Sequence, residues 1–180
     1  MIATRSAPAE GIVLKRSNTG EADRIVTILT REYGKIAGVA KGVRKLSSSK
    51  KSYLEPGNLI KVLLVRTGSL PIITQASLIH QAMESDATLR NIRSLVQWLE
   101  IMDKIFVEEE LEPELYQLVL STRAHCLAPK VNIDQLQKQL ASILQLLGFN
   151  EEQGEKNYSI TQFVNTIADR PLKGFEYLTV

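Results

Sequence analysis

The sequence has few of the residues on which many enzymes and secreted proteins depend. Its 180 residues contain one cysteine and two histidines. A single cysteine can form neither a disulfide within the chain nor a cysteine-built zinc site. Apolar runs stay well below the roughly 20 residues that a membrane helix needs, and the N-terminus has no apolar signal core. We therefore expect a cytoplasmic protein.

Catalytic and nucleotide-binding patterns are missing as well. No phosphate-binding loop occurs, because GVAKG at 38–42 is too short for one. His125 and Cys126 are adjacent, but neighbours on a helix point about 100° apart and cannot readily share a proton. The glutamates in 108–114 are typical of a solvated helix junction rather than a metal site. We expect neither an enzyme nor a cofactor.

Acidic residues are absent from one long basic stretch. Between Glu32 and Glu55 there is none, whereas this stretch contains six cations: Lys35, Lys41, Arg44, Lys45, Lys50 and Lys51. Residues 1–80 carry 13 Lys+Arg and 5 Asp+Glu, and residues 81–180 carry 9 and 15. This asymmetry predicts that the basic half meets a polyanion, with internal charge matching between two domains as the alternative.

Residues 11–79 show the pattern of a small β-barrel. Five short segments rich in β-branched residues alternate with turn signals, at 11–16, 24–30, 35–41, 59–65 and 71–79. Gly68 predicts a hairpin between the last two. The third segment alternates Ile36, Gly38, Ala40 and Gly42 on one face, which permits tight curvature. A closed antiparallel barrel would leave no strand edge exposed.

Two features of the barrel half suggest a nucleic-acid surface. Val43–Tyr53 is polar, basic and serine-rich, and we expect it to be a mobile loop between the third and fourth strands. Cations on a barrel attract phosphates without demanding a sequence. Tyr33 and Tyr53 flank the basic stretch and are the only aromatic residues of residues 1–80, so they are the candidates for base stacking.

After His80 the apolar period becomes helical. A first helix is predicted by the stripe Leu89, Ile92, Val96, Leu99, Met102 and Phe106. Pro113 suits the first turn of a second helix that reaches about Leu127. Asn132 with Gln135 predicts the start of a third helix, and Ser159 with Gln162 the start of a fourth. The predicted fold is α+β, with a barrel over residues 1–80 and a helical domain over 81–180.

The order of several motifs is similar to that of a known family. The motifs are GIVLKR after Glu10, GEADRIV, T-R-E-x-G-K, A-K-G-x-R, L-E-P and LPIITQASLI. From Glu10 to Ile79 the chain resembles the N-terminal domain of the bacterial recombination mediator RecO. The resemblance implies a five-stranded OB-fold barrel joined to a helical domain.

The resemblance also implies a function in DNA repair and recombination. Members of this family bind single- and double-stranded DNA, anneal complementary strands and act with RecR to load RecA on strands coated by the single-strand binding protein SSB. Such a role in the RecFOR pathway needs no nucleotide hydrolysis and places the protein at the nucleoid. By position, the implied DNA contacts are Lys15, Arg16, Arg24, Lys35, Lys41, Arg44 and Lys45. Charge alone adds Lys50, Lys51 and Arg66.

The second half departs from the family. Many members carry a four-cysteine zinc motif after the helix that ends in LLG, and this chain has no cysteine there. We therefore expect no zinc and a shortened helical domain. The family's SSB contact lies on the helical domain, where Arg90, Arg93, Arg123, Lys130 and Lys138 would supply a basic rim. Two alternatives stay open: a protein-interaction adaptor that docks an acidic partner, and an RNA-binding barrel.

Overall fold

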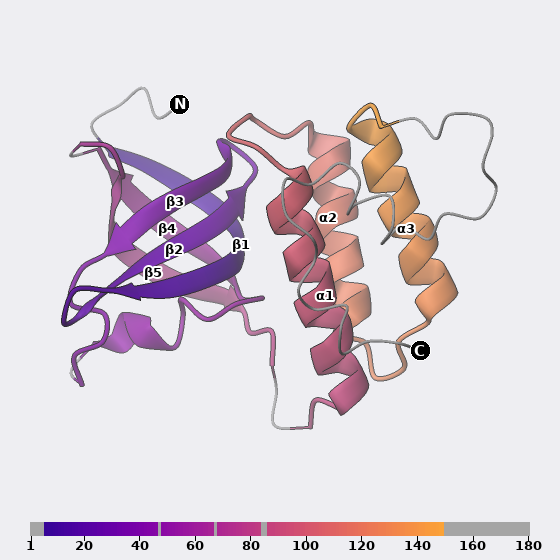
Figure 1. The fold of residues 1–180 in the computed structure, drawn as a ribbon, viewed down its shortest axis with the longest axis horizontal. Coiled ribbons are helices and arrows are strands. Elements are labelled where there is room, and N and C mark those ends of the chain that lie inside the picture. The colour runs from indigo at the N-terminus through magenta and orange to yellow at the C-terminus, as the bar shows by residue number, and fades with distance from the viewer. Residues whose placement is uncertain (1–5, 47, 67, 84–85, 150–180) are drawn as a thin grey trace. The chain divides into compact units, whose positions relative to one another are not determined.

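The computed structural model describes residues 6–46, 48–66, 68–83 and 86–149. The chain divides into two compact units. The barrel unit comprises Met1–Glu84 and Phe106–Leu111, and the helical unit comprises Ser85–Ile105 and Glu112–Val180. Figure 1 shows five strands in the first and three helices in the second. The predicted α+β class, with a five-stranded sheet followed by helices, is confirmed.

The strands close into a barrel in the order β1-β2-β3-β5-β4. Their bounds are β1 Ser6–Thr19, β2 Asp23–Thr30, β3 Gly34–Ala40, β4 Leu59–Val65 and β5 Ile72–His80. Four of the strand pairs are antiparallel. The fifth, between β3 and β5, is parallel and rests on the single register pair Val39 and Ile72. The predicted hairpin of the last two strands is confirmed.

Strand β1 begins earlier than the sequence pattern indicated. It starts at Ser6 rather than Gly11, pairs with β4 through its first half and with β2 through its second, and shifts register between Val13 and Lys15. The first half was not predicted because it contains Pro8, which has no backbone N–H to donate. Residues 6–10 pair with β4 alone, and a proline is tolerated at such a strand edge. Ala7 and Ala9 alternate with Pro8 and are buried in the core.

The barrel core is apolar, and β3 contributes its smallest face. Ile36, Gly38 and Ala40 share that face, as predicted, and all three are buried. A Cβ on Gly38 would lie 3.0 Å from Cγ1 of Ile73, so the absent side chain lets β5 approach. Gly42 lies beyond the strand in a turn with φ of +64°, a conformation that glycine adopts without strain.

The helices are α1 Leu89–Ile105, α2 Pro113–Cys126 and α3 Ile133–Leu146. Pro113 occupies the first turn of α2, and the side-chain oxygen of Asn132 accepts from the backbone N–H of Gln135 at 3.2 Å, both as predicted. The predicted fourth helix lies outside the described residues. Among the helices of the described ranges, none combines the length and the apolar composition of a membrane span.

The predicted buried face of α1 is partly wrong. Leu89, Ile92 and Val96 are 62%, 40% and 50% exposed. The buried face carries Asn91, Leu95, Trp98, Met102 and Ile105 instead. The buried face was not recognised from the sequence because it contains the polar residue Asn91. Its side-chain amide donates to the backbone oxygens at 126 and 128, at 3.0 and 2.8 Å, so it is satisfied inside the unit.

Candidate nucleic-acid interface

The predicted cations fall into three sets that differ in their surroundings, and the first set is paired with a carboxylate. Arg16 and Arg24 lie diagonally across the paired strands β1 and β2, opposite Val26 and Asn18, and share one carboxylate. Nε of Arg16 donates to Oε2 of Glu55 at 2.7 Å, and Nη1 of Arg24 donates to Oε1 at 3.2 Å. The Arg24 side chain is only 7% exposed, and its Nε also reaches Oδ1 of Asn18 at 3.4 Å. Both arginines are therefore engaged by a carboxylate of the barrel itself, which leaves less of their charge for a ligand.

Sequence reasoning missed the role of Glu55. The signal for it was the L-E-P motif directly before β4, which supplies the one carboxylate between Glu32 and the end of the barrel's fourth strand. The neighbouring Asn58 is also buried, and its amide donates to the backbone oxygens at 52 and 53 at 3.0 and 3.1 Å. Glu55 therefore fixes the arginine pair, and Asn58 fixes the turn into β4.

A second set of cations belongs to the basic loop, which we define as Lys41–Lys51. Three of its backbone or side-chain groups bind the turn between β1 and β2. The N–H of Gly42 donates to Oδ1 of Asp23 at 2.7 Å, and the N–H of Arg44 donates to the oxygen of Ala22 at 2.9 Å. Nη1 of Arg44 also donates to the oxygen of Gly20 at 3.3 Å. The first half of the loop is thus fixed beside that turn.

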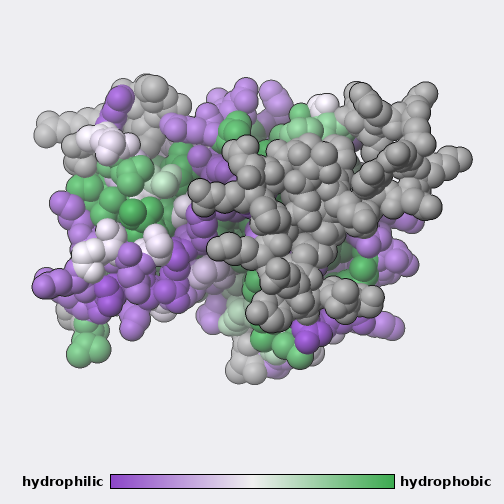
Figure 2. Space-filling view, in the orientation of Figure 1, coloured by the Kyte–Doolittle hydropathy of each residue, from purple (hydrophilic) through white to green (hydrophobic). Residues whose placement is uncertain are grey.

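The second half of the basic loop contains the short 3-10 helix η1, Ser49–Lys51. Lys50 is half-buried and donates through Nζ to the backbone oxygen of Thr74 on β5 at 3.1 Å. Leu46, between the two halves, is 103% exposed. In Figure 2 hydrophilic residues gather along the lower rim of the barrel unit, where η1 lies in Figure 1.

The charge of the basic loop is not neutralised by carboxylates. Lys41, Arg44, Lys45 and Lys51 are exposed. Arg16 and Arg24 pair with Glu55 and Arg31 pairs with Glu32, whereas among the described residues these four loop cations form no ion pair. A group of exposed cations without counter-charges produces a positive potential that attracts phosphates. The loop therefore differs in kind from the arginine pair on Glu55.

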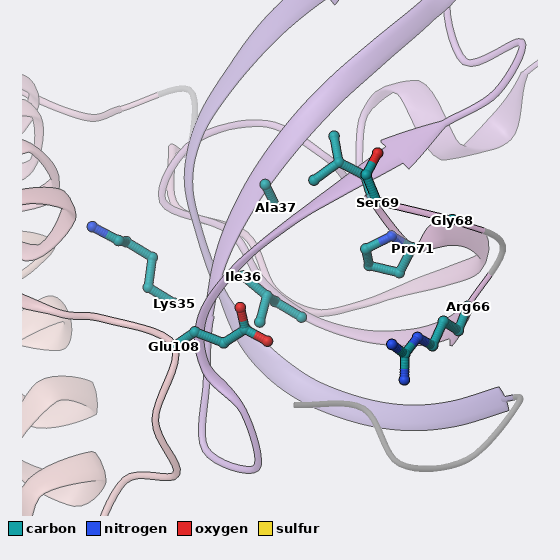
Figure 3. Close-up of a pocket in the computed structure, with 9 residues that line it drawn as sticks. Lys35, Ile36, Ala37, Arg66, Gly68, Ser69, Pro71 and Glu108 are labelled. Carbon is teal, nitrogen blue, oxygen red and sulfur yellow. The ribbon is translucent and has the colours of Figure 1, made fainter.

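A third set lines a hollow of about 300 Å³ between β3, the β4–β5 turn and residue 108. Lys35 and Arg66 contribute charge, and Ile36, Leu70 and Pro71 contribute apolar surface. Figure 3 shows the guanidinium of Arg66 and the carboxylate of Glu108 directed toward the hollow, whereas the ammonium of Lys35 points away from it. Glu108 was not predicted at this site, because a run of glutamates is typical of a solvated helix junction.

The remaining predicted residues take less prominent positions. Lys15 is exposed on β1 at the register shift. Tyr33 and Tyr53 are half-buried and pack against the barrel core, so each offers only part of its ring for stacking.

Two side chains of the helical unit, Arg123 and Cys126, are internal. Arg123 is only 3% exposed, so its predicted place on a basic rim is wrong. Burial lowers its pKa to about 10, an effect that nearby Cys126 and Tyr116 oppose. Burial raises the pKa of the Cys126 thiol to about 12, which disfavours the nucleophilic thiolate.

His125 has a structural role beside that cysteine. Its Nε2 accepts from the N–H of Asn132 at 3.3 Å, so Nδ1 carries the proton and donates to Gln139 at 3.0 Å. The ring therefore joins α2 to α3. In the part of the chain that the structure describes, no group of three His, Cys, Asp or Glu residues is arranged to hold a metal ion.

Comparison with known proteins identifies the barrel. Residues 5–82 match the family model described as Recombination protein O N terminal. The predicted resemblance to RecO is confirmed. The DNA repair protein RecO of Bifidobacterium longum (strain DJO10A) is 39% identical over 115 residues, 62% of this chain and 47% of that protein. That of Cutibacterium acnes is 36% identical over 115 residues, 61% and 46% of the two chains.

A third relative matches a shorter stretch with higher identity. The DNA repair protein RecO of Frankia casuarinae is 50% identical over 70 residues, 39% of this chain and 29% of that protein. The chain spans about half the length of the RecO proteins of Bifidobacterium and Cutibacterium that it matches. The residues that match the family model, 5–82, all lie in the barrel unit.

Proposed function

We propose that this chain is a DNA-binding mediator of repair and homologous recombination. The observation that carries the proposal is the basic loop, whose exposed cations have no carboxylate partner among the described residues, on a RecO-type barrel. Phosphate backbones are the ligands that such a surface favours. The same charges would bind any sequence, which suits a protein that handles whatever DNA is damaged.

The barrel would bind DNA as an OB fold does. Barrels of that fold use the face of strands 2 and 3 and the loops between strands 1 and 2 and between strands 4 and 5. Here the basic loop is bound to the β1–β2 turn through Arg44, and Arg66 lies directly after β4, at the start of the β4–β5 turn. The cations thus lie at the elements from which an OB fold contacts a single strand.

The proposed contacts differ in role. Lys41, Arg44, Lys45 and Lys51 would bind backbone phosphates directly, with Lys15, Lys35, Lys50 and Arg66 extending the surface. Arg16 and Arg24 would act mainly by positioning, because Glu55 neutralises much of their charge. Tyr33 and Tyr53 would stack on bases with the exposed parts of their rings.

Strand annealing follows from this electrostatic surface. Two complementary strands repel each other until their phosphate charges are screened. A cationic loop on the surface of a bound barrel can face a second backbone and screen both. No nucleotide hydrolysis enters this scheme. We further propose the family's partners for this chain, RecR and the SSB-coated strands on which RecA is loaded, with the cytoplasmic nucleoid as the place of action.

An annealing assay tests the proposal. Two complementary oligonucleotides are mixed with and without the 180-residue chain, at low and at physiological salt, in the absence of nucleotide. We expect acceleration that decreases as salt rises, because the surface acts through counterion release. Absence of acceleration together with absence of DNA binding at low salt would contradict the proposal.

One observation favours a second function. Leu46 is fully exposed within the basic loop, and an apolar side chain among cations suits an acidic peptide with apolar residues. A protein-interaction adaptor would use the loop in this way. The two functions separate in one titration, since the adaptor would not bind DNA at physiological salt.

A further inference from the structure

The segment Phe106–Leu111, which we name the acidic strap, connects α1 to α2 but packs with the barrel unit. Its backbone binds the barrel at two places. The N–H of Lys35 donates to the oxygen of Val107 at 2.8 Å, and the N–H of Leu111 donates to the oxygen of Arg31 at 2.9 Å. Its end residues Phe106 and Leu111 are only 2% and 5% exposed. The strap is therefore anchored at both ends.

Gly34 allows the strap to lie this close to the barrel. Its φ is +62°, and an added Cβ would lie 2.5 Å from the oxygen of Val107 and 2.6 Å from the nitrogen of Glu109. Real Cβ atoms do not come that near to backbone atoms, so only glycine fits. The approach depends on the identity of this residue rather than on chance packing of a linker.

Between its anchors the strap presents three consecutive exposed carboxylates, on Glu108, Glu109 and Glu110. Of these, Glu108 lines the hollow that Arg66 also lines. Figure 3 shows both charged groups directed toward that hollow from opposite sides. The hollow lies between β3 and the β4–β5 turn, and β3 pairs with β5 only through Val39.

We infer that this hollow is a phosphate subsite of the nucleic-acid interface and that Glu108 competes with the nucleic acid for it. The inference rests on the proposed function. Arginine is suited to the subsite because its planar fork binds phosphate oxygens in pairs. The carboxylate of Glu108 offers Arg66 a negative group in the absence of a strand and repels a phosphate that approaches. The acidic strap thus lowers the affinity of the barrel for DNA.

The test is a comparison of Glu→Gln variants, which keep size and remove one charge. Affinity of the full 180-residue chain for a fluorescent single-stranded oligonucleotide is measured at low and at high salt. We expect E108Q to bind about three- to tenfold more tightly than the wild type at low salt, with the gain shrinking at high salt. E110Q is the matched control, because it removes an equal charge from the same strap but does not line the hollow.

A second pair of variants assigns the effect to Arg66. In an R66Q background the phosphate subsite has lost its donor, so adding E108Q should change affinity no more than E110Q does. Equal gains for E108Q and E110Q, a gain that persists fully with R66Q, or a loss of affinity in E108Q would each overturn the inference while leaving the proposed function intact. A wild-type chain that binds no DNA at low salt would overturn both.

Discussion

The barrel unit and the helical unit each bury an arginine among their described residues, in different surroundings. Arg24 of the barrel is 6% exposed and is bound by the carboxylate of Glu55. Arg123 of the helical unit is 3% exposed, and desolvation lowers its pKa to about 10. A residue count from sequence treats both as surface cations. The structure shows that neither contributes a freely available positive charge.

The net charge of a region therefore differs from the charge that its exposed, unneutralised side chains can offer to a ligand. The basic loop keeps Lys41, Arg44, Lys45 and Lys51 exposed. The charge of Arg16 and Arg24 is partly neutralised within the barrel, since each arginine forms an ion pair with Glu55. The central claim is therefore that affinity for nucleic acid resides in the loop rather than in the summed charge of the N-terminal half.

The largest expected effect is on the reactivity of Cys126, which sharpens the contrast from the helical side. Burial raises its pKa to about 12, so at neutral pH the thiolate should be about a thousandfold rarer than in the unfolded chain. Labelling by a thiol reagent in native buffer and in denaturant measures how far the fold suppresses this reactivity, through both the thiolate fraction and access to the thiol, and the signal is specific because the chain has one cysteine. Comparable rates in the two conditions would mean that the interior of this unit is open to solvent.

The next effect tests how the barrel holds the acidic strap. Gly34→Ala should lower the free energy of unfolding by about 3 kcal/mol or more, because a strained φ and a backbone clash add together. Gly20→Ala is the matched control, since Gly20 has a φ of +54° and no atom near an added Cβ. It should cost about 1 kcal/mol in the same urea titration. Equal losses of unfolding free energy in the two variants would contradict close packing of the acidic strap against Gly34.

A smaller effect tests whether Glu55 neutralises the arginine pair. Glu55→Gln leaves the side chain of Arg24, 7% exposed, without its carboxylate. We expect a loss of about 1–2 kcal/mol in unfolding free energy, reduced because Glu55 is itself partly solvated. Glu32→Gln breaks the more exposed pair with Arg31 and should cost less than about 0.5 kcal/mol. A ranking in the opposite order would show that Arg24 is stabilised by something other than Glu55.

Much of the fold could be predicted because local patterns decide it. Alternating β-branched segments gave five strands, and Pro113 and Asn132 gave the starts of two helices. The first half of β1 could not be predicted, since Pro8 is tolerated only through its edge position, a tertiary property. The buried face of α1 was misplaced for a related reason, because Asn91 is buried through bonds to a segment 35 or more residues away.

The candidate site was less predictable than the fold. The exposed cations of the basic loop could be predicted, because a polar, serine-rich segment has little apolar surface to bury and keeps its charges in solvent. They could not show that Glu55 neutralises Arg16 and Arg24 from 39 and 31 residues away. Nor could they show that Glu108 returns to the barrel, since a glutamate run has the same local pattern whether it is solvated or anchored.

The most direct measurement compares two triple variants in a salt titration of single-stranded DNA binding. K41A/R44A/K45A removes three exposed cations from the basic loop, and R90A/R93A/K130A removes three from the described part of the helical unit. The account predicts that the loop variant binds more weakly at low salt and that its slope of log affinity against log salt flattens by about 2. The helical-unit variant should keep the wild-type slope. Equal slopes in the two variants would contradict the claim that the loop carries the affinity.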